Sequence, residues 1–136
     1  MSQENVEVIR AAFRCFEAGD VDGVLSLVDE NVVVIQAPEL LVLLGASPNQ
    51  YGHAGVLEAF GYWPEQWDGF RIEILRVVDA GDRVLLTTTQ HGRGKGSGVE
   101  VEMPFWFVFA VRAGKIVEWR IFTRESDALK VVGLEE

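Results

Sequence analysis

The chain has 136 residues, and 49% of them are hydrophobic, so it can form one domain with a buried core. Its formal net charge is -9, with acidic residues spread along the whole chain. Nucleic-acid-binding proteins need a basic surface that replaces condensed counterions. We therefore expect no nucleic acid partner and no anionic membrane partner, and we treat residues 1–136 as a single domain.

The few cysteine and histidine residues limit metal and disulfide chemistry. Cys15 is the one cysteine, so no internal disulfide can form, which suits a reducing cytoplasm. Cys15, His53 and His91 are too few for a typical structural zinc site, so we expect no metal. Sequence motifs for nucleotide, flavin and metal binding are missing, so we expect no cofactor. The N-terminus lacks the order of a signal peptide, and no apolar run has membrane-spanning length. We expect a cytoplasmic protein.

Helical spacing dominates the beginning of the chain. Residues 3–18 are predicted to form a first helix, because one apolar stripe recurs at helical spacing: Val6, Ile9, Phe13 and Phe16. Gly19 should end this helix. Asp20 can then cap a short second helix that carries Val24, Leu25 and Val28.

A short strand and a third helix follow. The β-branched residues 32–35 predict a strand, and residues 39–50 read as irregular, with an apolar start. Residues 54–67 predict the third helix, in which Gly61 and Pro64 should bend or break the regular turns.

Two-residue alternation begins after Gly69. Residues 70–74 alternate cleanly, and the shift of phase at 75–78 predicts a bulge or sharp curvature. A hairpin turn at 80–82 leads into a strand at 84–91. The glycine-rich residues 92–98 predict a flexible loop. They do not form a phosphate cradle, because no Gly-Lys-Ser/Thr ending and no helix follow them.

The longest predicted strand covers residues 99–111. One of its faces is apolar throughout and consists of Val99, Val101, Met103, Phe105, Phe107 and Phe109. On the other face Glu100 and Glu102 give way to Trp106 and Val108, so the end of the strand should be covered on both sides. Helices can cover one side, and an identical subunit is the simplest cover for the other. We therefore expect a homodimer, with a monomer as the alternative.

A turn at 113–114, a last strand at 116–122 and a helical tail at 126–134 complete the chain. Helices followed by a meander of strands predict an α+β fold with an antiparallel sheet. Four segments carry a family resemblance: FEAGD at 16–20, GHAGV at 52–56, DAGDRV at 79–84 and AGKIVE at 113–118. By their order and spacing the chain resembles the nuclear-transport-factor-2-like superfamily, in its SnoaL-like and ketosteroid-isomerase-like branch. The resemblance implies a cone-shaped curved sheet, mixed or antiparallel, packed on three helices around an apolar pocket.

The catalytic patterns of that superfamily are broken in this sequence. Where the resemblance implies an acid/base Asp in the last strand, the chain has Ile121. The isomerase-like pattern needs an Asp on the first strand, where residues 32–36 hold no carboxylate, and a Tyr where the first helix offers Phe13 and Phe16. The epoxide-hydrolase-like pattern needs Arg and Asp two residues apart, where residues 87–91 read TTTQH.

Three residues remain as catalytic candidates. His91 ends an apolar strand, and imidazole is the side-chain group best suited to exchange protons at neutral pH, so His91 can act as acid or base. Alternatively, it is simply hydrogen-bonded or solvated at the strand end. Glu39 adjoins an apolar segment that could raise its pKa, or it is a solvent-facing acid. Arg120 could hold a carboxylate or enolate oxygen; if Val117 and alternate residues face the pocket, Arg120 shares the opposite face with Glu118, where they could pair across a dimer interface.

An apolar pocket is the other candidate site. The residues that we predict to line it are Phe13, Phe16, Ile35, His53, Trp63, Trp67, Met103, Phe105, Trp119 and Ile121. They could equally fill the core, and His53 could make only a local contact at the helix start. Three functions follow: binding of a small apolar ligand of lipid, terpenoid, polyketide or steroid type; cofactor-free proton transfer such as isomerisation, cyclisation or dehydration; or a non-catalytic dimeric interaction module.

Overall fold

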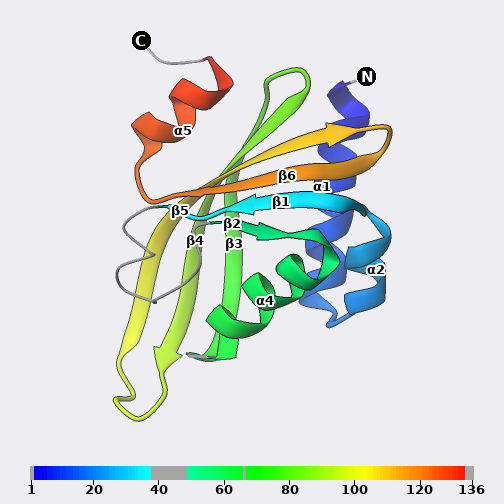
Figure 1. The fold of residues 1–136 in the computed structure, drawn as a ribbon. Helices are drawn as coiled ribbons and strands as arrows, with labels where there is room; N and C mark the ends of the chain where they lie inside the picture. Colours follow the sequence, from blue (N-terminus) through cyan, green and yellow to red (C-terminus); the bar gives the residue numbers. More distant parts are fainter. Residues whose placement is uncertain (1, 38–48, 66, 134–136) are drawn as a thin grey trace.

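The computed structural model describes residues 2–37, 49–65 and 67–133, and the side chains of residues 2, 49 and 59–65 lie outside that description (Figure 1). The elements, in chain order, are α1 (Ser2–Glu17), α2 (Val21–Ser26), β1 (Val28–Ile35), β2 (Asn49–Tyr51), α4 (Gly52–Glu65), β3 (Trp67–Asp79), β4 (Arg83–Gly94), β5 (Glu100–Arg112), β6 (Lys115–Phe122) and α5 (Glu125–Val132). No helix among these residues is long and apolar enough to cross a bilayer.

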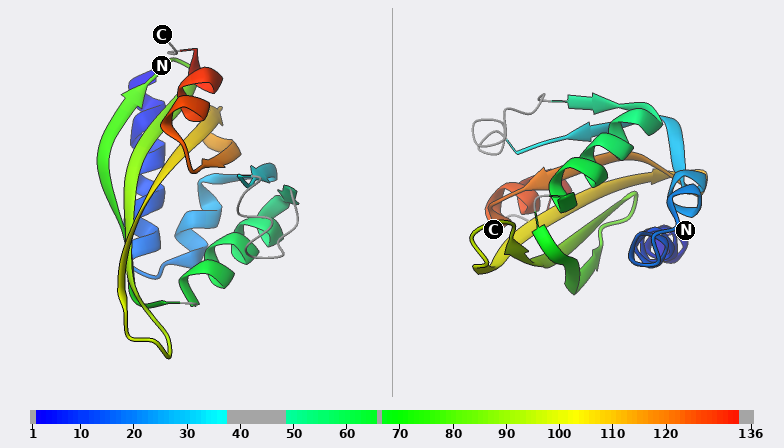
Figure 2. Two further views of the ribbon diagram at one scale, coloured as in Figure 1. Left: turned by 90° about the vertical axis from the view of Figure 1, so that its left-hand side faces the viewer. Right: turned by 90° about the horizontal axis from the view of Figure 1, so that it is seen from below.

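The six strands of the described residues form one mixed sheet in the order β2-β1-β6-β5-β4-β3. β1 and β6 run parallel, and the other neighbouring strands are antiparallel. The sheet curves around α1 and α4, as Figure 2 shows. α1 packs against β3, β4, β5 and β6, and α4 packs against β1, β2 and β3. The predicted curved α+β fold is confirmed.

The first two helices agree with the sequence pattern except at one boundary. Ile9 and Phe13 are buried along α1, and Gly19 ends the helix region with a left-handed φ of 72°. α2 stops at Ser26, so Val28, which was predicted to lie on the helix, begins β1 instead. β1 therefore contains Asp29, a first-strand carboxylate that the sequence prediction placed before the strand.

Trp67 lies at the start of β3, although the helical pattern predicted it as the end of the third helix. α4 ends one residue after Pro64. The predicted bulge in β3 is present as a register shift between Ile74 and Arg76. β4 continues past His91 to Gly94, so the connection to β5 is shorter than the predicted glycine-rich loop.

The concave face of the sheet holds the main core. Its buried residues on α1, β4 and β5 include Ile9, Phe13, Val84, Leu86, Phe105, Phe107 and Phe109. A second cluster lies on the other face of the sheet, where Ala128 of α5 packs with Leu85 and Val108. α5 thus covers part of the sheet face that we expected an identical subunit to cover.

A bulge in the last hairpin decides which residues of β6 face the core. The β5–β6 register shifts between Ala110 and Val111, so Val117 is an extra residue on its strand. Ile116, and not Val117, is buried in the main core together with Trp119.

Candidate apolar ligand site

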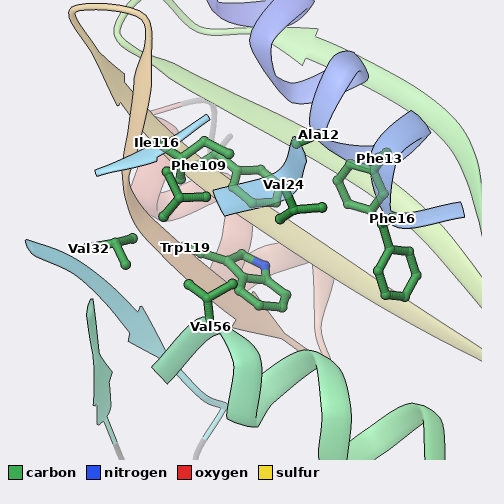
Figure 3. Close-up of a pocket in the computed structure, with 10 residues that line it drawn as sticks. Ala12, Phe13, Phe16, Val24, Val32, Val56, Phe109, Ile116 and Trp119 are labelled. Carbon is green, nitrogen blue, oxygen red and sulfur yellow. The ribbon is translucent and has the colours of Figure 1, made fainter. Parts of the chain in front are cut away.

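An apolar cavity of about 20 Å³ lies between the sheet and the helices α1, α2 and α4 (Figure 3). Its lining consists of Ala12, Phe13, Phe16, Val24, Val28, Val32, Val56, Phe109, Ile116 and Trp119. A water molecule needs about 10–15 Å³ of such space. We call this space the inner cavity; it has room for about one water-sized group.

Four aromatic rings fill the region around the inner cavity. Phe109 and Trp119 stack with their ring centroids 6.0 Å apart, and Phe107 meets Trp119 edge to face at 5.5 Å. Phe13 on α1 lies 6.3 Å from Phe107 and 6.0 Å from Phe109. The two-residue period of β5 puts Phe107 and Phe109 on one face, and the β5–β6 register puts Trp119 beside Phe109.

A larger apolar space opens beside the inner cavity, between the end of α1, α2 and the start of α4. This space, the outer groove, has a volume of about 210 Å³ and is lined by Phe16, Gly19, Asp20, Val21, Val24, Leu25, Val56 and Leu57. Phe16, Val24 and Val56 line both spaces. At the rim, Val21 is 51% exposed and Leu57 is 45% exposed. The two spaces therefore adjoin one another at Phe16, Val24 and Val56, which are the shared lining within the part of the chain that the structure describes.

Among the described residues that line the two spaces, Asp20 is the one titratable residue. Its Oδ1 accepts a hydrogen bond of 2.9 Å from the backbone N–H of Gly23, so the carboxylate caps α2. The described lining of the inner cavity consists of apolar side chains and the indole of Trp119. This lining can recognise an apolar ligand and offers no acid/base pair.

The structure gathers three of the predicted ligand-binding residues at the inner cavity: Phe13, Phe16 and Trp119. Phe105 and Ile121 are buried in the same core but line neither the inner cavity nor the outer groove. Their strand positions aim them at the core, as the alternation predicted.

Four other predicted ligand-binding residues lie elsewhere or outside the described part. Met103 packs at the margin of the core. Trp67 is half-buried and packs so closely on Gly92 that a Cβ added to that glycine would lie 2.8 Å from the Trp67 Cβ. The side chain of Trp63 lies outside the described residues. Ile35 is on the outer face, because its neighbours Val32 and Val34 on the alternating strand are the ones that point into the core.

His53 makes a local contact. Its Nε2 donates a hydrogen bond of 2.8 Å to the carbonyl oxygen of Val28, which ties the start of α4 to β1. The side chain is half-buried and lines neither space. The structure thus agrees with the alternative interpretation of His53, a local contact at the helix start.

His91 lies on the outer face of the sheet. Val84 and Leu86 face the main core, so strand alternation turns His91 the other way. Its Nε2 is 2.9 Å from Glu73 Oε1, and its Nδ1 is 3.3 Å from Glu102 Oε1. The imidazole therefore joins β3, β4 and β5 on the side of the sheet opposite the inner cavity.

Arg120 also lies on the outer face. Its Nε donates to Glu118 Oε1, and the same oxygen is 3.7 Å from Arg83 Nη1. The prediction that Arg120 and Glu118 share a face is confirmed, and they pair within one chain. Glu39 lies outside the described residues. Among the described residues no group of His, Cys, Asp and Glu is arranged to hold a metal ion.

Residues 9–119 match the family model of the SnoaL-like domain. The chain belongs to the SnoaL-like domain family. No curated protein matches this SnoaL-like protein by sequence.

Solved structures match the fold of this SnoaL-like domain over nearly its full length. TerC co-crystallised with polyporic acid is 24% identical and has a TM-score of 0.76, with 96% of this chain and 98% of that chain covered. An NTF2-like protein of unknown function from Burkholderia pseudomallei is 18% identical with a TM-score of 0.77, and the match covers 95% and 97% of the two chains.

A protein from Catenulispora acidiphila with a ketosteroid isomerase-like fold, in complex with trimethylamine, is 15% identical with a TM-score of 0.70. The match covers 94% of this chain and 93% of that chain. At these identities the likeness shows the fold that the SnoaL-like domain shares with these proteins.

Sequence reasoning missed most of the short apolar residues of the SnoaL-like site. Val24, Val28, Val32 and Val56 line the inner cavity, although each has the pattern of an ordinary core residue. A valine that faces a cavity and a valine that faces another side chain produce the same periodicity. Position gave a signal for two of them, since Val24 and Val28 flank the junction between α2 and β1.

Proposed function

We propose that this SnoaL-like domain binds a small, neutral, apolar molecule in the outer groove, between the end of α1, α2 and the start of α4. The outer groove supports the proposal, because an apolar space of about 210 Å³ opens to the surface and adjoins an aromatic interior. Ligand sites are typically concave and apolar, with few polar groups.

The size and charge of the groove define the ligand class. An engineered protein cavity of about 150 Å³ binds benzene, so the outer groove has room for one aromatic or alicyclic ring. Asp20 at the groove and a net charge of -9 disfavour an anionic ligand. A neutral one-ring molecule fits both observations.

Two similar folds hold small molecules, which is consistent with the proposal. The TerC structure contains polyporic acid, and the Catenulispora acidiphila structure contains trimethylamine. Both proteins are less than 25% identical to this chain, so their ligands do not define the ligand of this chain, and the chemistry of the groove does.

Proton transfer without a cofactor is the alternative. A general acid or base must lie within hydrogen-bond reach of the reacting group. His91 and Arg120 lie on the outer face, and Asp20 is engaged in capping α2. The described lining therefore favours binding over acid/base catalysis.

An interaction module is the third candidate, and it needs a large exposed apolar patch. Among the described residues the exposed large hydrophobic side chains are Val21, Tyr51, Leu57, Leu75 and Val99. Val21 and Leu57 line the outer groove, whereas Tyr51 lies on β2, Leu75 on β3 and Val99 in the β4–β5 connection. The homodimer remains a prediction, and native mass spectrometry of the purified protein tests it.

Calorimetric titration with toluene tests the proposed function. We expect saturable binding of one toluene per chain, and binding of benzoate that is weaker by about tenfold or more. Leu57→Asp places a charge at the groove rim and should weaken toluene binding, whereas Leu75→Asp, at an exposed position on β3 away from both spaces, should not. Equal effects of the two variants, or no saturable binding to the wild type, would overturn the proposal.

A further inference from the structure

We infer that Phe16 sets the size of ligand that the site admits, because its ring separates the outer groove from the inner cavity. This inference rests on the proposed function and assigns the specificity of the same site to one side chain. With the ring in place the groove accepts one ring. With the ring moved or removed, the two spaces join and a two-ring ligand can reach Trp119.

The position of Phe16 on α1 places it at the boundary. Phe13 lines only the inner cavity, Gly19 lines only the outer groove, and Phe16, midway between them, lines both. Residues three apart on a helix lie on one face, so Phe13 and Phe16 follow one another along the wall. In Figure 3 the ring of Phe16 stands at one end of the group of lining side chains.

Phe16 is the part of the boundary that can move. Val24 and Val56 also line both spaces, but they are only 7% and 3% exposed, and a β-branched side chain has few rotamers. Phe16 is half-buried, and its longer side chain projects from the last turn of α1. A change at its χ1 moves a whole ring, whereas a change at either valine moves a methyl group.

Phe70 holds the Phe16 ring in its present position. The two rings meet edge to face, with centroids 6.4 Å apart and planes at 88°. Phe70 lies on β3 and lines neither space. Phe70 thus contacts the Phe16 ring from the side of the sheet. Together with Val24 and Val56, the Phe16 ring forms the wall between the inner cavity and the outer groove.

A gain of binding distinguishes this role from ordinary core packing. If Phe16 only fills the core, Phe16→Ala lowers stability and improves naphthalene binding no more than the removal of another half-buried phenylalanine ring does. If Phe16 separates the two spaces, the same change joins them, adds the volume of the lost ring and opens the way to the stacked rings of Phe109 and Trp119. Larger apolar ligands then bury more surface and bind more tightly.

The experiment measures the affinities of toluene and naphthalene for four proteins: the wild type, Phe16→Ala, Phe16→Leu and Phe122→Ala. Phe122 is a matched control, because it is also a half-buried phenylalanine and lines neither space. We expect Phe16→Ala to bind naphthalene about tenfold more tightly than the wild type does, with a smaller gain for Phe16→Leu. Phe122→Ala should bind both probes as the wild type does. Thermal melting checks that each variant is folded, and Phe16→Leu serves if Phe16→Ala does not fold.

The outcomes separate this inference from the proposed function. If the wild type binds toluene but neither Phe16 variant gains affinity for naphthalene beyond that of Phe122→Ala, the role of Phe16 is overturned and the proposed function stands. If the wild type binds no probe and Phe16→Ala binds naphthalene, the substitution has created a site that the wild type lacks, and both the proposed function and the role of Phe16 are overturned. If none of the four proteins binds either probe, both are overturned.

Discussion

Phe109 on β5 and Trp119 on β6 are cross-strand partners whose rings stack, with centroids 6.0 Å apart and only 10° between their planes. Both side chains are buried, at 3% and 5% exposure, and both line the inner cavity. The same stack therefore belongs to the hydrophobic core and to the inner cavity that adjoins the proposed ligand site. Changes in it should alter stability and ligand binding together.

Trp119→Ala should strongly reduce the free energy of unfolding. Removing a buried tryptophan costs about 3–5 kcal/mol, because the transfer free energy of the ring and its packing contacts are both lost. Trp119→Phe keeps a ring against Phe109 and should cost less. Urea denaturation of the three proteins measures the difference, and a loss in Trp119→Ala no larger than in Trp119→Phe would contradict the packing described here.

Gly92→Ala should destabilise the protein more than Gly94→Ala. A Cβ at Gly92 would lie 2.8 Å from the Cβ of Trp67, an atom next to the backbone that cannot move aside. At Gly94 the nearest atom is the Oγ of Ser97, at 2.6 Å, and a hydroxyl in a turn can rotate away. Overpacking of the first kind costs about 1–3 kcal/mol. Urea midpoints in the reverse order would show that β3 and β4 are not packed as closely as described.

Asp20→Ala should remove the cap of α2 and loosen one wall of the outer groove. The lost hydrogen bond to the Gly23 N–H costs about 1 kcal/mol of stability. Asp20→Asn keeps an acceptor oxygen and should retain most of that stability. Thermal melts of the two variants test the cap, and equal losses would indicate that the charge of Asp20, not its hydrogen bond, stabilises this end of α2.

His91→Ala and Arg120→Ala should leave the affinity for toluene unchanged. Both side chains lie on the outer face, where His91 contacts Glu73 and Glu102 and Arg120 contacts Glu118. Calorimetric titration of the two variants checks the expectation. Loss of binding in either variant, with the melting temperature preserved, would place the ligand on the outer face.

The fold could be predicted from the sequence because its periodic signals are strong. The stripe on α1, the alternation in β5 and the turns at Gly81 and Gly114 all appear where the pattern puts them. Boundaries without such signals were wrong. Val28 is apolar and suits a helix or a strand equally well, so the sequence pattern does not assign it. Trp67 begins β3 instead of ending the helix, and there it packs closely against Gly92, a contact that local propensity cannot reveal.

The site could be predicted only in part. Large aromatic residues at core-facing positions can be recognised in the sequence as candidates for a pocket lining, and Phe13, Phe16 and Trp119 do line the inner cavity. The face on which His91 lies depends on which alternate residues of β4 point into the core. The sequence alone does not decide this, because both faces of the strand carry apolar residues. The bulge in β6 turns Ile116, and not Val117, toward the core. It is a property of the β5–β6 pairing and cannot be recognised from the residues themselves.

Backbone amide NMR of the wild-type protein during a toluene titration tests the proposed ligand site most directly. Saturable chemical-shift changes should cluster at Phe16, Val24, Val56 and Leu57, which surround the outer groove, and the amides of His91 and Arg120 should stay unchanged. No saturable shift, or shifts that cluster around His91 on the outer face, would contradict an apolar ligand site in the outer groove between α1, α2 and α4.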